Sequence, residues 1–357
     1  MADKANGRNS AFELMRITAM FMIVIGHCVM VTAQDQEPYL GTIDNIGWFI
    51  KAFTVCAVNL FFLLTGYYAQ GKRIRFGKTI ELWIKTIFYS VGIYIISCLF
   101  GNKVQIKSLI KYLFPITFKT YWYMQVWVVL SLVSPFVAKL LDSINKMTHT
   151  ILICLLICFF SLHQTLIPVS NTLDQTQGYG ISWAIVMFII GNWIYKYAKT
   201  YIINIPALFF AIGYVLCSLT IFASNYLIVK YDIAKGVQSR GNFYAYNSVT
   251  VLVQSLCMYM IFVLLSEKHI NSSIITKISQ NMIAVYLISG HPILLVSLWD
   301  NCMNMRQYWE KPFLYVIIAI LITLITMVVC VAIDKMMDFV FGLTGLKKKI
   351  TLLQVEL

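Results

Sequence analysis

The sequence predicts an all-α, polytopic membrane protein with about ten transmembrane helices and both termini in the cytoplasm. Hydrophobic residues fill 59% of the 357 positions and charged residues only 12%, whereas soluble domains carry about 25% charged residues. Several apolar runs reach the roughly 20 residues that a helix needs to cross a bilayer. Lys and Arg gather mainly in alternate loops, which is the bias that orients membrane proteins with basic loops inside.

Hydropathy places the spans at about 11–33, 46–70, 80–101, 121–141, 149–167, 181–198, 206–229, 248–267, 277–299 and 312–335. Residues 1–345 are therefore expected to form a single integral-membrane domain, followed by a short basic cytoplasmic tail at 346–357. The net charge of +13 lies mainly in loops that set the orientation, so it does not indicate a nucleic-acid partner.

The connection between the third and fourth spans is predicted to form an amphipathic helix in the membrane interface. Lys103, Lys107 and Lys111 recur every four residues, with apolar residues between them. Such lysines usually snorkel from a surface helix. The alternative is an outer basic surface near an anionic, lipid-linked substrate.

The other outer connections are rich in aromatic residues. Interfacial belts of Tyr and Trp are the expected explanation, and a sugar-stacking surface is the alternative. The residues concerned are Tyr39, Tyr179, Tyr231, Phe243, Tyr244, Tyr246, Tyr308 and Trp309.

The first span carries the strongest candidates for chemistry, Glu13, Arg16 and His27. Arg16 and His27 are eleven residues apart, which returns to nearly the same helix face at a separation of about 16 Å along the axis. Such residues are expensive in lipid and are functional candidates by default. Glu13 can pair with Arg16 three residues later. The structural alternative is that Arg16 snorkels inward and His27 bonds a neighbouring backbone group.

Four cations follow the second span at Lys72, Arg73, Arg75 and Lys78. They serve either as topology anchors or as a grip on the phosphates of a nucleotide-containing donor such as coenzyme A. Just before them, Thr65 and Gly66 are small enough to allow close helix packing.

Further candidates lie in later spans. His163 and His291 fall at a depth similar to His27, and Pro292 predicts a kink beside His291. Each histidine alone is more typical of a helix–helix contact. Trp122 and Tyr123 begin the fourth span, where they form a belt or the wall of a cavity.

Together these segments resemble the membrane-bound acyltransferase-3 family of bacterial surface-polysaccharide O-acetyltransferases. The resemblance runs through the Arg-x10-His pattern of Arg16 and His27, the segment 61–67 (Phe-Phe-Leu-Leu-Thr-Gly-Tyr), Arg73 and Arg75, the aromatic segment 121–123, and residues 278–288. Two departures stand out. Ser289 occupies the place where the family commonly has His, and the loop lacks a clear Arg-x-x-Arg.

The resemblance implies transfer of an acyl group, usually acetyl, from cytoplasmic acyl-CoA to a hydroxyl of an extracytoplasmic, lipid-linked glycan. It places the enzyme in the bacterial plasma membrane among membrane lipids, with acetyl-CoA as donor and no metal. We interpret His27 as the general base, Arg16 as a donor-binding or positioning group and Glu13 as its orienter. The remaining expected contacts are Arg73, Arg75 and Lys78 for the donor, and Trp122, Tyr123, His163 and His291 for the acceptor.

Two other functions fit the buried polar residues. A transporter or flippase for a lipid-linked sugar would move its substrate without consuming acetyl-CoA. A membrane module that senses a cell-wall precursor is the other. Matching halves with broken helices are frequent in transporters, and no such repeat is evident in the sequence.

Overall fold

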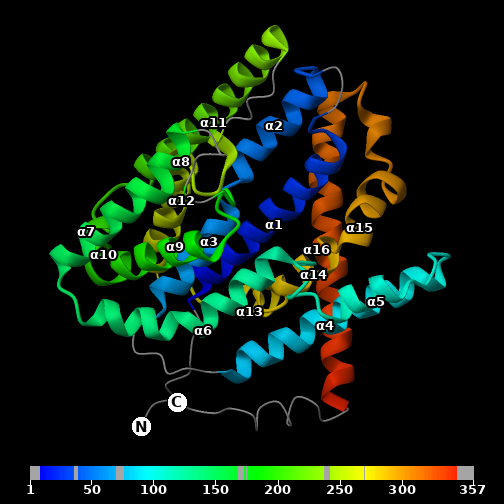
Figure 1. Ribbon diagram of the computed structural model, residues 1–357, viewed down its shortest axis with the longest axis horizontal. Coiled ribbons are helices and arrows are strands. Elements are labelled where there is room, and N and C mark those ends of the chain that lie inside the picture. The colour runs from blue at the N-terminus through cyan, green and yellow to red at the C-terminus, as the bar shows by residue number, and fades with distance from the viewer. Residues whose placement is uncertain are drawn as a thin grey trace.

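The computed structural model describes residues 9–35, 39–69, 76–167, 173, 175–236, 242–268 and 270–343, and this part of the chain is helical throughout (Figure 1). The helices are α1 (Ser10–Thr32), α2 (Thr42–Thr54), α3 (Ala57–Tyr67), α4 (Phe76–Leu99), α5 (Ile106–Leu113), α6 (Trp122–Asp142), α7 (Lys146–Ile157), α8 (His163–Leu166), α9 (Ile181–Trp193), α10 (Lys199–Ile202), α11 (Ala207–Lys235), α12 (Val249–Ser266), α13 (Ser273–Ser279), α14 (Met282–Ser289), α15 (Pro292–Val296) and α16 (Pro312–Leu343).

The predicted fold class is confirmed. In the described part, nine helical segments are long and apolar enough to cross a membrane, and a bent pair supplies a tenth candidate. Three of the nine are compound, because α2 with α3, α7 with α8, and α9 with α10 each make one candidate span. The predicted basic tail, 346–357, lies outside the described residues.

Helix α1 is the central element of the bundle. It packs against α2, α3, α12, α13, α14 and α16, and Figure 1 shows it in blue between these helices. Asn9 begins it by accepting a hydrogen bond from the Ala11 amide (3.0 Å), the usual role of an N-cap. At its other end, Thr32 bonds the hydroxyl of Tyr315 near the start of α16 (2.7 Å). Helices α1 and α16 are therefore antiparallel, and α1 begins at the face where α16 ends.

The predicted second span, 46–70, is broken in the middle. Helix α2 ends at Thr54 and α3 begins at Ala57. A break at this depth leaves carbonyl groups without helical partners, and side chains supply the missing donors. Gln254 donates to the carbonyl of Ala52 (2.7 Å), and Tyr214 donates to that of Phe53.

Helices α3 and α9 cross at backbone contact. A Cβ added at Gly66 would lie 2.0 Å from the carbonyl oxygen of Phe188, and one at Gly191 would lie 2.1 Å from that of Leu63. Only glycine fits at either position. The prediction that Gly66 permits close packing is confirmed.

The predicted kink at Pro292 is also confirmed. The helical segments on either side, Ser273–Ser289 and Pro292–Cys302, are bent by 80°. Backbone groups at the bend are again satisfied by side chains. Tyr121 donates to the carbonyl of Leu287 (2.8 Å), and Nδ1 of His291 accepts from the amide of Ile293 (3.1 Å).

The amphipathic helix predicted near 103–111 is α5, which extends from the side of the bundle (Figure 1). Lys103 precedes the helix and does not belong to it. Apolar side chains on α5 remain exposed, with Ile106 at 76% and Ile110 at 44%, as expected for a helix that lies against lipid. Tyr112 is buried and stacks between Tyr94 and His291.

Candidate active site

A partly enclosed cavity lies beside the second half of α1. It holds about 610 Å³ of space free of protein atoms, including the space at its open side. Its walls come from α1, the α2–α3 break, α6, α14 and the loop before α12, so distant parts of the sequence meet here. The lining residues are Met20, Met22, Ile23, Gly26, His27, Lys51, Thr54, Val55, Ala57, Val58, Phe61, Trp122, Tyr123, Tyr246, Ile283 and Tyr286.

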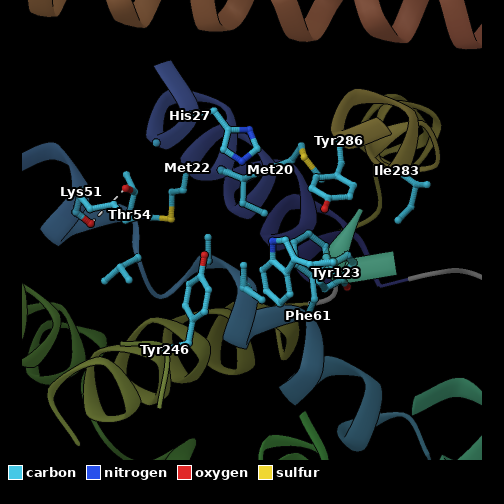
Figure 2. A pocket seen from close by; sticks show the side chains of 16 residues that line it. Met20, Met22, His27, Lys51, Thr54, Phe61, Tyr123, Tyr246, Ile283 and Tyr286 are labelled. Carbon is cyan, nitrogen blue, oxygen red and sulfur yellow. Dashed lines mark hydrogen bonds between the residues drawn. The ribbon is translucent and has the colours of Figure 1, made fainter. Parts of the chain in front are cut away.

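His27 lines this cavity and makes no hydrogen bond within the described part of the protein. Its Nδ1 is buried without a partner. In Figure 2 the ring faces a space bordered by Tyr286, Tyr123 and Tyr246. The alternative in which His27 bonds a neighbouring backbone group is therefore not observed. An imidazole whose ring nitrogen has no hydrogen-bond partner and faces a cavity can take a proton from a hydroxyl that enters the cavity.

Aromatic side chains form one wall of the cavity. Trp122 stacks on Tyr246, with ring centroids 5.7 Å apart, and Tyr179 contacts both, at 4.5 Å from Trp122 and 4.7 Å from Tyr246. Burial raises the pKa of the Tyr246 phenol well above its ordinary value, so the hydroxyl stays protonated near neutral pH. Rings with a hydroxyl handle are well suited to a sugar, which has an apolar face and a polar edge.

The interfacial-belt expectation is wrong for Tyr246. Its loop folds back into the protein, where the Tyr246 amide donates to the carbonyl of Gln177 (3.1 Å) and Asn59 donates to the carbonyl of Tyr246 (2.9 Å). Asn59 in turn accepts from Trp183 (3.0 Å). Tyr39 and Tyr231 remain exposed, at 50% and 55%.

Glu13 and Arg16 form the ion pair that their spacing predicts. Glu13 is buried at 3% exposure and also accepts a hydrogen bond from Ser279 of α13. The side chain of Arg16 stays 31% exposed, so guanidinium donors remain available beyond the Glu13 contact. Glu13 is therefore fixed from two helices, and it holds Arg16 in place.

Arg16 does not line the cavity but lies on the same stripe of α1. Met20, Ile23 and His27 all line the cavity, and with Arg16 they are spaced at intervals of four, three and four residues, which keeps them on one helix face. Arg16 is also close enough to act electrostatically on Tyr123. The stripe thus connects the ion pair near the start of α1 with the cavity.

The four residues predicted to contact the acceptor separate into two pairs. Trp122 and Tyr123 line the cavity as expected, whereas His163 and His291 do not. His291 caps α15 and packs against Tyr112 and Tyr121. It lies next to Gly290, where an added Cβ would come within 3.3 Å of Cε1 of His27. The geometry thus favours a structural role for His291.

The predicted donor-binding cations cannot be placed with the cavity. Arg73 and Arg75 lie outside the described residues, and Lys78 lies in α4 with no description of its side chain.

Sequence reasoning did not select several residues that line the cavity. Lys51 is the main one. A lysine inside an apolar span is the same kind of signal that drew attention to Arg16, so it was available in the sequence. Thr54, Phe61 and Tyr286 carry no such signal, because hydroxyl and aromatic residues are ordinary components of membrane helices.

A comparison with protein families finds one match. A family model described as an acyltransferase domain, that of the acyltransferase 3 family, matches residues 9–334, which is nearly the whole chain. No curated protein and no solved structure gives a significant match.

Proposed function

We propose, from the premise that this chain belongs to the acyltransferase 3 family, that it transfers acetyl from cytoplasmic acetyl-CoA to a hydroxyl of an extracytoplasmic, lipid-linked glycan. Family membership makes the protein a multi-pass membrane acyltransferase that uses an acyl donor. The identity of donor and acceptor is our proposal. The observation that carries it is the His27 ring, which lines a cavity with an aromatic wall and whose Nδ1 is buried without a hydrogen-bond partner.

In the proposed reaction His27 removes the proton from the acceptor hydroxyl. The hydroxyl oxygen attacks the thioester carbonyl, and the tetrahedral intermediate collapses by breaking the carbon–sulfur bond. The coenzyme A thiolate leaves and takes up the proton that His27 accepted. The products are the sugar ester and free coenzyme A.

The donor is proposed to bind at the Arg16 end of the stripe. With the start of α1 in the cytoplasm, Arg16 lies on the side where coenzyme A is found, and His27 lies about 16 Å further along the axis. The guanidinium is suited to a phosphate or carboxylate, and Glu13 fixes its orientation. Arg73, Arg75 and Lys78 are proposed to contribute further phosphate contacts. In the bacterial plasma membrane, the opposite side faces the glycan.

The test is glycan acetylation in cells that carry wild type, His27→Gln or His163→Gln at matched protein levels. His163 is a matched control, because it is also a histidine in a candidate span but does not line the cavity. Loss of a general base lowers rates by about 10²- to 10⁴-fold, so we expect acetylation to fall at least 100-fold in His27→Gln and to persist in His163→Gln.

Undiminished acetylation in His27→Gln would remove this residue from the mechanism. If wild type consumes no acetyl-CoA yet moves a lipid-linked sugar across liposome membranes, the transporter alternative replaces the enzyme.

A further inference from the structure

Lys51 lies in the apolar wall of the same cavity as His27. Two contacts between α1 and α2 define its depth. Gly47 packs on Ala33, and Gly26 packs on Thr54. Lys51 lies between Gly47 and Thr54, one turn before Thr54, so it is level with a point just past His27 on α1. It therefore lies on the side of His27 away from Arg16, and it is close enough to act electrostatically on the imidazole.

The Lys51 ammonium has no carboxylate or hydrogen-bond partner within the described residues; only the backbone carbonyl of Lys51 is bonded, by the Thr54 hydroxyl (3.3 Å) and the Val55 amide (2.9 Å). Asp44, the other ionisable residue of α2, accepts hydrogen bonds from the amides of Asp35 (2.8 Å) and Leu40 (3.0 Å). Two other lysines that lie in candidate spans do have carboxylate partners, namely Lys85 with Asp334 (2.6 Å) and Lys199 with Glu267 (2.8 Å).

An ammonium group at membrane depth without a counterion is unfavourable. Among the residues that line the cavity, only Lys51 and His27 have side chains that can carry a positive charge, and none has a carboxylate. The protein thus leaves a positive charge in the cavity that a bound anion would neutralise.

We propose that Lys51 forms an anion subsite for the acceptor, which binds a carboxylate or phosphate on the sugar that presents its hydroxyl to His27. This inference rests on the proposed function, because the donor phosphates are assigned to the Arg16 end of the stripe. The thioester itself is neutral, which leaves the acceptor as the source of the anion. The site therefore selects acidic sugars, such as a uronic acid or a sugar phosphate, over neutral ones.

Ligand binding tests this subsite without requiring turnover. The purified full-length protein in detergent is titrated with D-glucuronate, D-glucose 1-phosphate or D-glucose, at an ionic strength held constant with sodium chloride. Binding is read as the rise in the midpoint of thermal unfolding. The variants are Lys51→Met, which keeps the length and loses the charge, and Lys51→Arg, which keeps the charge. Lys230→Met, at an exposed position of α11, controls for loss of one positive charge.

We expect the two anionic sugars to stabilise wild type, Lys51→Arg and Lys230→Met at lower concentrations than glucose does. In Lys51→Met the concentration of anionic sugar needed should rise at least tenfold. Equal responses to glucose and to both anions, or equal responses in wild type and Lys51→Met, would overturn the subsite. A response to only one of the two anions would support the subsite and would identify whether it binds a carboxylate or a phosphate.

A kinetic arm separates this inference from the proposed function. If wild type transfers no acetyl, the proposed function fails, while the binding result stands by itself. If Lys51→Met slows transfer to neutral and anionic acceptors equally while anion binding is unchanged, Lys51 acts on the reaction and not on acceptor choice, and the subsite is overturned.

Discussion

Two regions of the protein hold ionisable side chains within the helical bundle, and they differ in whether these side chains have partners. Between α4 and α16, Asp334 is 1% exposed and accepts hydrogen bonds from Lys85 (2.7 Å) and Tyr89 (2.7 Å). In the cavity, His27 and Lys51 find no partner among the described residues. A complete set of partners is typical of a structural contact, whereas unpartnered groups that line a cavity leave room for a ligand to supply the partner.

The Glu13–Arg16 pair is intermediate between these regions. Glu13 is satisfied from within the protein by Arg16 and Ser279, as Asp334 is by its partners. Arg16 keeps part of its surface free, as the cavity residues do. The pair thus joins a fixed carboxylate to an available cation, which is the arrangement expected of a positioned binding group.

The largest loss of stability should come from removing the carboxylate of Asp334, which pairs with Lys85. Asp334→Asn leaves the Lys85 ammonium, on a side chain that is 21% exposed, without its counterion, and breaking such a pair destabilises by up to about 3–5 kcal/mol. The double variant Lys85→Met/Asp334→Leu should recover most of that loss. Thermal and denaturant unfolding in detergent measures both. If Asp334→Asn retains wild-type stability and instead loses acetyl transfer, the distinction between the two regions fails.

A packing defect at the crossing of α3 and α9 should give the next largest effect, and it shows how a purely structural change affects stability. Gly66→Ala places a Cβ 2.0 Å from a backbone oxygen of α9, so α3 and α9 must separate, at a cost of about 3 kcal/mol.

The matched control is Gly92→Ala in α4, where an added Cβ meets nothing within 4 Å. It should leave stability unchanged or raise it slightly, because alanine favours helices over glycine. Equal unfolding midpoints for the two alanine variants would contradict the close crossing. His27→Gln is expected to resemble Gly92→Ala in stability while losing transfer.

The smallest effect should come from weakening the support of the Glu13–Arg16 pair. Ser279→Ala removes one hydrogen bond to the Glu13 carboxylate, and bonds to charged groups contribute about 1.5–3 kcal/mol. We expect kcat for acetyl transfer to fall roughly tenfold as Arg16 loses part of its orientation, with KM for the acceptor unchanged.

Ser289→Ala is the control for this variant. Ser289 is also a buried serine of the same bent segment, but it donates to the Val285 carbonyl of its own helix (2.7 Å). An identical fall in kcat in both serine variants would mean that loss of a buried hydroxyl, and not the orientation of Glu13, causes the effect.

Hydropathy and charge spacing predicted the features that depend on local sequence. The spans, the Glu13–Arg16 pair and the kink at Pro292 all follow from neighbouring residues, and all are present. The break between Thr54 and Ala57 could not be foreseen in the same way. It occurs in a continuous apolar run without proline or glycine, and its carbonyls are satisfied by Tyr214 and Gln254 from far along the chain.

The cavity was predictable only in part for a similar reason. His27, Trp122 and Tyr123 stood out by residue type. Tyr246 was noted only as one of several outer aromatic residues, because hydropathy assigns its segment to an outer loop, and only long-range contacts such as the one with Asn59 draw it inward. Lys51 was detectable as a charge in a span, but its relation to His27 appears only when α1 and α2 pack together.

The 80° bend between α14 and α15 has a consequence for enzyme tuning. Gly290 lies at this bend and packs its backbone against the imidazole of His27. A Cβ added at Gly290 would lie 3.3 Å from Cε1 of His27 and 2.8 Å from the carbonyl oxygen of Tyr286. Because residue 290 has no side chain, the bend can approach the His27 ring closely, and the size of this residue limits where the ring can lie in the cavity. Enlarging residue 290 is a way to shift the base relative to its substrate without altering any group that the substrate touches.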